Sequence, residues 1–123
     1  MSHIVSIKTE VRDAEAIKAS CKRLGLDEPF FAKATFYMRE EHVGWCIKLP
    51  GWLYFAVADL TTGQVHFDNY EGRWGDQKHL DAFVQAYAVE KAILEARKRG
   101  HTVFEQPLPD GSVKLTIHVG GAA

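Results

Sequence analysis

The sequence predicts an α+β fold, a two-layer sandwich in which two helices cover one face of a mostly antiparallel sheet. Three observations predict it. Apolar residues recur at helical spacing in two separate segments, a short one near the beginning and a longer one in the last third of the chain. Segments rich in β-branched and aromatic residues surround these helices, and turn signals separate them. The expected order is strand, helix, a meander of strands, helix and two closing strands.

The chain opens with an alternating segment. From His3 to Val11, valine, isoleucine and threonine occupy one parity and polar residues the other, which predicts a strand with one buried face. Asp13 then offers a helix N-cap, and apolar residues follow at helical spacing until Gly25. We therefore expect a short helix between Asp13 and Gly25.

The middle of the chain reads as an antiparallel meander. Aromatic and β-branched residues predict strands over residues 31–38, 43–49, 52–60 and 64–67. Pro50-Gly51 and Thr61-Thr62-Gly63 are typical of tight turns between them. Residues 68–75 then combine asparagine and glycines with two large aromatics, which predicts a loop.

The last third predicts a long helix followed by a hairpin. Asp76 precedes an apolar-periodic run from about Leu80 to Arg99, which ends at Gly100. Strands are expected over residues 101–106 and 112–119, and the second alternates clearly. We expect one domain over residues 1–119 and a flexible tail over residues 120–123.

Composition narrows the function classes. The 123 residues carry a formal charge of -1. Binding to nucleic acids and to anionic membranes relies on an excess of positive charge, so this charge argues against both kinds of partner. No apolar run is long enough to span a bilayer, and the chain opens without the pattern of a signal peptide, so we expect a cytoplasmic protein. Cys21 and Cys46 lie outside any Cys-x-x-Cys spacing, so no disulfide or thiolate zinc site is indicated.

Several short segments at the two ends of the chain carry a family resemblance. They are Met1-Ser2-His3-Ile4, Ile7-Lys8-Thr9, Asp13, Tyr87-Ala88, Gly100-His101-Thr102-Val103, Glu105-Gln106 and Asp110-Gly111-Ser112-Val113-Lys114-Leu115. In these the chain resembles the family called hypothetical chloroplast reading frame thirty-five, also known as domain of unknown function twelve fifty-seven. The middle, with Trp45, Trp52, Tyr70 and Trp74, departs from the family pattern. The resemblance implies the same fold and a bacterial or phage source, and it carries over no catalytic residue.

Polar groups that carry chemistry are scattered. No pair among the six histidines has the helical spacing of a zincin, and no nucleophile elbow or phosphate-binding loop is present, so we expect no catalytic residue and no cofactor. His66 and Asp68 share a face if their strand continues, which makes them weak candidates for a metal site. His3, in the part that matches the family, is the leading polar candidate for a pocket or for a structural hydrogen bond.

Aromatic residues are the more suggestive signal. Trp45, Trp52, Tyr54, Tyr70 and Trp74 crowd the meander and the loop before the long helix. Such rings fill sheet cores, and they also serve as anchors at interfaces or stack on ligands. Of these aromatic residues, Tyr70 and Trp74 are the two whose presence core packing explains least. Both lie close to Arg73 in the sequence.

The leading hypothesis is a non-enzymatic binding or assembly module, which contacts a protein partner or a second copy of itself. The contact residues would be His3, Trp52, Tyr70, Arg73 and Trp74, together with an open sheet edge. The alternative is a small-ligand or metal-binding protein, or an enzyme, with a pocket of histidine, tyrosine and tryptophan. A third option, stacking on single-stranded nucleic acid, lacks a basic groove.

Overall fold

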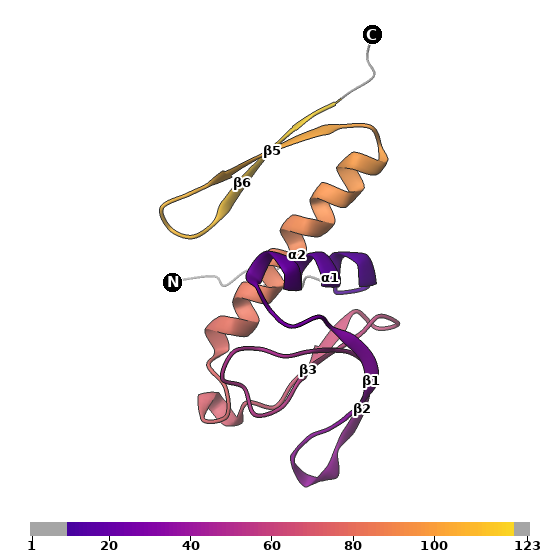
Figure 1. Ribbon diagram of the computed structural model, residues 1–123, viewed down its shortest axis with the longest axis vertical. Coiled ribbons are helices and arrows are strands. Elements are labelled where there is room, and N and C mark those ends of the chain that lie inside the picture. The colour runs from indigo at the N-terminus through magenta and orange to yellow at the C-terminus, as the bar shows by residue number, and fades with distance from the viewer. Residues whose placement is uncertain (1–9, 120–123) are drawn as a thin grey trace, which may run out of the picture.

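The computed structural model of the protein describes residues 10–119, and the predicted α+β class is confirmed (Figure 1). The helices are α1, Ala14–Leu24, and α2, Gln77–Lys98. The strands are β1, Phe30–Thr35; β2, Glu41–Ile47; β3, Ala56–Asp59; β4, Gln64–His66; β5, Thr102–Pro107; and β6, Val113–His118. Of the strand expected over residues 3–11, residues 3–9 lie outside the described part, and Glu10 and Val11 are not in a strand.

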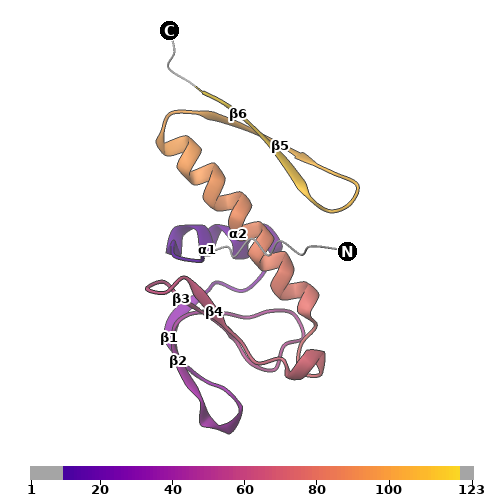
Figure 2. The same ribbon diagram turned by 180° about the vertical axis from the view of Figure 1, so that it is seen from behind.

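The described strands form two antiparallel sheets instead of one. Strands β1, β2, β3 and β4 pair in that order, and β5 pairs with β6 in a separate hairpin. Both views place the helices between the four-stranded sheet and the hairpin (Figures 1 and 2). Within residues 10–119 the expected single layer of strands is therefore divided, with α2 between its two parts.

Helix α1 begins and ends where the sequence predicts, whereas α2 begins at Gln77, before the expected start at about Leu80. The Asp13 side chain accepts hydrogen bonds from the first backbone N–H groups of α1, and Gly25 ends this helix in the left-handed conformation at φ 69°. Asp76 caps α2 through the N–H of Lys78, and Gly100 follows its C-terminus.

The main core lies between the helices and one face of the four-stranded sheet. Ile17 and Cys21 of α1 pack there with Phe83 and Tyr87 of α2 against Ile47 and the alanines of β3. Burial raises the pKa of the Cys21 thiol to about 11, so this cysteine behaves as an apolar core residue, as expected. Burial likewise raises the pKa of Cys46 on the opposite face.

Tyr87 joins the start of α1 to the middle of α2. Its side chain is only 1% exposed, and its hydroxyl oxygen accepts hydrogen bonds from the backbone N–H groups of Arg12 and Asp13, each at 3.0 Å. One turn further along α2, the Lys91 ammonium donates to Asp13 at 2.9 Å and to Glu95 at 2.7 Å. The Tyr87 hydroxyl and the Asp13–Lys91 ion pair together hold the N-terminus of α1 against α2.

Two meander strands are shorter than predicted because the loops next to them make hydrogen bonds of their own, and the strand expected over residues 43–49 lies two residues earlier, as β2. The strand expected over residues 52–60 begins only at Ala56, since the N–H of Leu53 donates to the carbonyl of Trp74 at 2.8 Å. The strand expected over residues 31–38 ends at Thr35, where the N–H of Phe36 donates to Glu40 and closes a loop.

Polar contacts attach the hairpin to the helices. Arg23 of α1 donates to Glu90 of α2 at 3.0 Å and to Glu105 of β5 at 2.7 Å, and Gln85 of α2 donates to the carbonyl of Gly111 at 3.1 Å. The apolar residues on the inner face of the hairpin are only partly buried.

No helix among residues 10–119 has the length and apolar character that crossing a membrane requires.

Replacing Tyr87 with phenylalanine tests the contact between the helices. The change leaves two partly buried N–H groups, those of Arg12 and Asp13, without their acceptor. We expect the free energy of unfolding to fall by about 1–3 kcal/mol. Urea unfolding followed by circular dichroism measures the loss. The control Tyr37→Phe changes an exposed tyrosine, and an equal loss in both variants would contradict this role for Tyr87.

The Asp13–Lys91 pair makes stability depend on pH. The hydrogen bond from Lys91 holds the pKa of Asp13 below its ordinary value, so the stabilisation is complete above the unfolded pKa of about 3.9 and is lost as the pH falls through the folded pKa. Asp13→Asn keeps an N-cap side chain but removes the charge. As the pH is lowered from about 6 to about 2, the urea midpoint should fall less steeply for the variant than for wild type. Parallel pH curves would show that the pair contributes nothing.

Candidate functional site

A partly exposed cluster of aromatic side chains gathers around the half-buried Trp74, beside the N-terminus of α2. The Trp74 ring stacks on Tyr70 with centroids 4.7 Å apart, and it also contacts Tyr37 at 5.2 Å and Tyr54 at 5.8 Å. Tyr37 is 54% exposed and Tyr70 50% exposed. With their neighbours they form what we call the aromatic surface, which comprises Tyr37, Met38, Tyr54, Tyr70, Arg73 and Trp74.

Two short loops in an uncommon backbone conformation present this surface. One is the 3-10 segment Tyr37–Arg39 between β1 and β2, and the other is Tyr70–Gly72 after β4. Among residues 10–119, four non-glycine residues have positive φ, and all four lie in these loops: Met38 at 63°, Arg39 at 61°, Tyr70 at 47° and Glu71 at 53°. Such conformations cost free energy in L-residues and concentrate at binding and active sites. Glycine would adopt these φ values without that cost.

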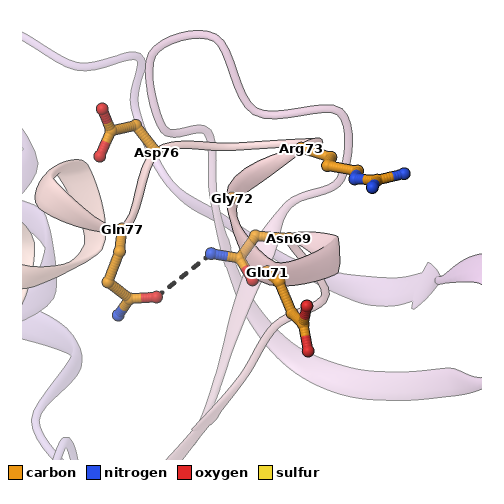
Figure 3. A pocket seen from close by; sticks show the side chains of 6 residues that line it. All are labelled: Asn69, Glu71, Gly72, Arg73, Asp76 and Gln77. Atoms are coloured by element: carbon orange, nitrogen blue, oxygen red, sulfur yellow. Dashed lines mark hydrogen bonds between the residues drawn. The ribbon is translucent and has the colours of Figure 1, made fainter.

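The second loop is braced from beneath. Asn69, which is nearly buried, donates through its side-chain amide to the carbonyl of Gly75 and to the side chain of Gln77, each at 3.2 Å (Figure 3). The N–H of Trp74 donates to the carbonyl of Asn69 at 2.9 Å, and its carbonyl accepts from Leu53. The backbone on both sides of the Trp74 ring is therefore held in place.

Trp52 supports the loop from the core. Its ring is only 7% exposed, and its indole N–H donates to the carbonyl of Asp76 at 3.0 Å. Gly75 lies so close to this ring that a Cβ atom added there would overlap the indole. Trp52, predicted as a contact residue, is thus placed in the core by its apolar surroundings, while the predicted residues Tyr70, Arg73 and Trp74 come together on the surface.

A shallow polar cavity of about 610 Å³ adjoins the aromatic surface. Asn69, Glu71, Gly72, Arg73, Asp76 and Gln77 line it (Figure 3). The Arg73 guanidinium lies over the Tyr70 ring at 5.1 Å, a cation–π contact that joins the cavity to the aromatic surface. Two carboxylates and one guanidinium offer polar recognition there, without a nucleophile beside a general base.

The remaining predicted candidates are His3, His66 and Asp68. His3 lies outside the described residues. His66 stacks on His42 with centroids 4.1 Å apart, and Asp68 accepts a hydrogen bond from the N–H of Tyr70. Among residues 10–119 no group of three or more histidine, cysteine or acidic side chains is arranged to hold a metal ion. His66 and Asp68 thus have separate structural partners.

Sequence reasoning missed the first of the two loops. It assigned Tyr37 and Met38 to a strand, whereas the structure places them in the loop that faces Trp74. The available signal was the charged run Arg39-Glu40-Glu41, which marks a chain reversal and leaves the two preceding apolar residues at its tip.

Comparisons of the chain with protein-family models, curated proteins and solved structures find no match. The geometry of the aromatic surface is therefore the feature of the molecule that points to a function.

The contact between Gly75 and Trp52 supplies a test of how the second loop is held. Gly75→Ala forces the new methyl group against the indole, and we expect overpacking to lower the free energy of unfolding by about 1–3 kcal/mol. Thermal unfolding measures the change. In the double variant with Trp52→Phe, the smaller ring should relieve the overlap, so the combined loss should be less than the sum of the two single losses. A fully additive cycle would show that the two residues do not interact.

Proposed function

We propose that this protein is a binding or assembly module, non-enzymatic in its action, which contacts a protein partner or a second copy of itself through the aromatic surface. One observation carries the proposal: exposed aromatic and methionine side chains are presented by loops whose backbone is held in an unfavourable conformation. Selection for stability alone would replace such residues, whereas a contact surface needs them.

The composition of the aromatic surface fits an interface. Tyrosine, tryptophan, methionine and arginine are the residue types enriched in the centres of protein interfaces. Met38, at 81% exposed, is flexible and polarizable, and it adapts to the shape of a partner. The Trp74 ring instead is held by contacts with three tyrosine rings, so little side-chain entropy is lost when a partner covers it.

Open sheet edges offer a second mode of contact. The outer strands β1 and β4 and both strands of the hairpin each have one side without a hydrogen-bonded strand among residues 10–119. Such edges pair readily with a strand from another chain. The resemblance to the chloroplast reading frame family stays a prediction, and it adds no partner to this proposal.

The cavity beside Arg73 favours a second candidate function, the binding of a small ligand. Its volume of about 610 Å³ falls in the range of small-molecule sites. A thermal-shift screen against nucleotides and divalent metal ions separates the two readings, because a ligand that binds only the native state raises Tm. A raised Tm that Arg73→Ala abolishes would favour the ligand site over the interface.

Removing the Trp74 ring tests the proposed interface. Trp74→Ala deletes the ring that Tyr37, Tyr54 and Tyr70 all contact, and we expect association with a partner or with a second copy to weaken by about tenfold or more. Size-exclusion chromatography with light scattering measures self-association, and a pull-down from lysate of the source cells compares the partners retained by each variant.

The control for this experiment is Leu24→Ala, which removes another exposed apolar side chain, on α1 and outside both the aromatic surface and the open strand edges. Its association should equal that of wild type. A wild-type protein that is strictly monomeric, and whose retained partners are the same with and without Trp74, would contradict the proposal.

A further inference from the structure

The turn of the β5–β6 hairpin is an exposed segment rich in proline. It comprises Pro107, Leu108, Pro109, Asp110 and Gly111, and we call it the proline tip. Both prolines and Asp110 are exposed to solvent, and Leu108 is half-buried. Both views show this turn projecting beyond the helices at one edge of the molecule (Figures 1 and 2). A second molecule can therefore reach it.

Hydrogen bonds hold the proline tip in one shape. The N–H of Leu108 donates to the carbonyl of Ser112 at 2.8 Å, and the N–H of Gly111 donates to the carbonyl of Leu108 at 3.0 Å. From α2, the side chain of Gln85 donates to the carbonyl of Gly111 at 3.1 Å. The rings of the two prolines fix their own φ angles. Because the tip is ordered before it meets a partner, docking costs it little conformational entropy.

The aromatic surface has the chemistry that proline rings bind. Proteins recognise proline-rich segments on surfaces lined by aromatic rings, which the apolar pyrrolidine ring can cover. Tyr37 and Tyr70 contact Trp74 with centroids 5.2 and 4.7 Å away, and they are 54% and 50% exposed. Pro107 and Pro109 lie two positions apart, so their Cα atoms are at most about 7 Å from each other. A cluster of three contacting rings is wide enough to take both.

Asp110 gives the proline tip a negative charge. Its carboxylate accepts hydrogen bonds from the hydroxyl of Ser112 at 2.6 Å and from the N–H of the same residue at 2.9 Å. These bonds hold the pKa of Asp110 below its ordinary value, so the group is charged at neutral pH.

The aromatic surface offers the opposite charge at Arg73. This residue is exposed, and its guanidinium lies over the Tyr70 ring at 5.1 Å. Figure 3 shows the guanidinium pointing away from the carboxylates of Glu71 and Asp76 (Figure 3). The proline tip and the aromatic surface are therefore complementary in charge as well as in ring chemistry.

The same chain carries both halves of this contact. Gln85, in the first half of α2, holds the proline tip, and Trp74 lies just before Asp76, which caps the start of that helix. The turn of the hairpin and the segment that leads into α2 both lie toward the left in Figure 1 and toward the right in Figure 2. Two copies that face each other can thus make the contact twice, and the second contact then forms at a high effective concentration.

We propose that this protein associates with a second copy of itself, and that the proline tip of one copy docks on the aromatic surface of the other. Pro107 and Pro109 cover tyrosine and tryptophan rings, and Asp110 pairs with Arg73. This inference deepens the proposed function and rests on it, because it names the partner and the segment that the aromatic surface binds. A proline-rich segment of a different protein in the same place would leave this chain a monomer, which the test detects.

Two variants of the full chain test the contact from its two sides. Trp74→Ala removes the central ring of the aromatic surface. The tip variant, Pro109→Ala with Asp110→Asn, removes a ring and a charge, while the asparagine oxygen still accepts from Ser112 and keeps the turn. We expect each variant to weaken self-association by about tenfold or more. Size-exclusion chromatography with light scattering over a series of protein concentrations measures this.

The matched control is Pro50→Ala with Asp27→Asn. It makes the same two changes at exposed positions in other loops, outside both the proline tip and the aromatic surface. Its self-association should equal that of wild type. Thermal unfolding verifies that every variant is folded.

A mixture of the two variants tests whether unlike surfaces meet. Trp74→Ala keeps an intact tip, and the tip variant keeps an intact aromatic surface, so one contact can form between them. Fluorescence anisotropy of labelled Trp74→Ala should show that it binds the tip variant about tenfold or more tightly than either variant binds itself. An interface in which two aromatic surfaces meet face to face would gain nothing from mixing.

Three results would overturn the inference: a wild-type protein that is monomeric at every concentration, a tip variant that associates like wild type, or a mixture that binds no better than its components. If the tip variant behaves like wild type while Trp74→Ala weakens association or the retention of partners, the tip contact alone is rejected and the proposed function stands. If Trp74→Ala changes neither, both are rejected.

Discussion

The hydroxyl of Tyr87 is the contact on which the arrangement of the two helices depends. It lies in the core, and it accepts the backbone N–H groups of Arg12 and Asp13 at the point where the chain enters α1. Buried backbone groups need partners, so a side chain from α2 that satisfies two of them fixes where α1 begins. The position of α1 then determines where Ile17 and Cys21 meet the sheet. Asp13 connects the same point to Lys91, and thus serves α1 both as cap and as ion-pair partner.

Local signals were enough to predict most of the elements. Asp13, Gly25 and Asp76 act within one turn of the residues they cap, so both helices could be placed from the sequence. The residues before Ala56 could not be placed, because Trp52 and Leu53 are held by bonds to Trp74 and Asp76, which lie more than twenty positions away. The division of the strands between two sheets likewise depends on tertiary packing. Alternation of apolar residues shows which face of a strand is buried, but it does not show which strands pair.

Only the part of the candidate site that lies in one continuous segment could be predicted from the sequence. Tyr70, Arg73 and Trp74 lie in one loop, and their composition marked them as a group. Tyr37 and Tyr54 join them only because the chain reversal after β1 and the turn before β3 both approach Trp74. Positive φ at Met38 and Glu71 has no signature in sequence, since both residues normally avoid it. The conformation that most strongly marks this region for function is therefore visible only in three dimensions.

The hairpin is attached to the helices through polar side-chain contacts. A single guanidinium, that of Arg23, links α1, α2 and β5, and this side chain is partly exposed to solvent. Dissolved ions screen exposed charges far more than they affect apolar packing. High ionic strength should therefore release the amide protons of β5 and β6 to exchange while those of the central helices stay protected, so the hairpin would open as an independent unit.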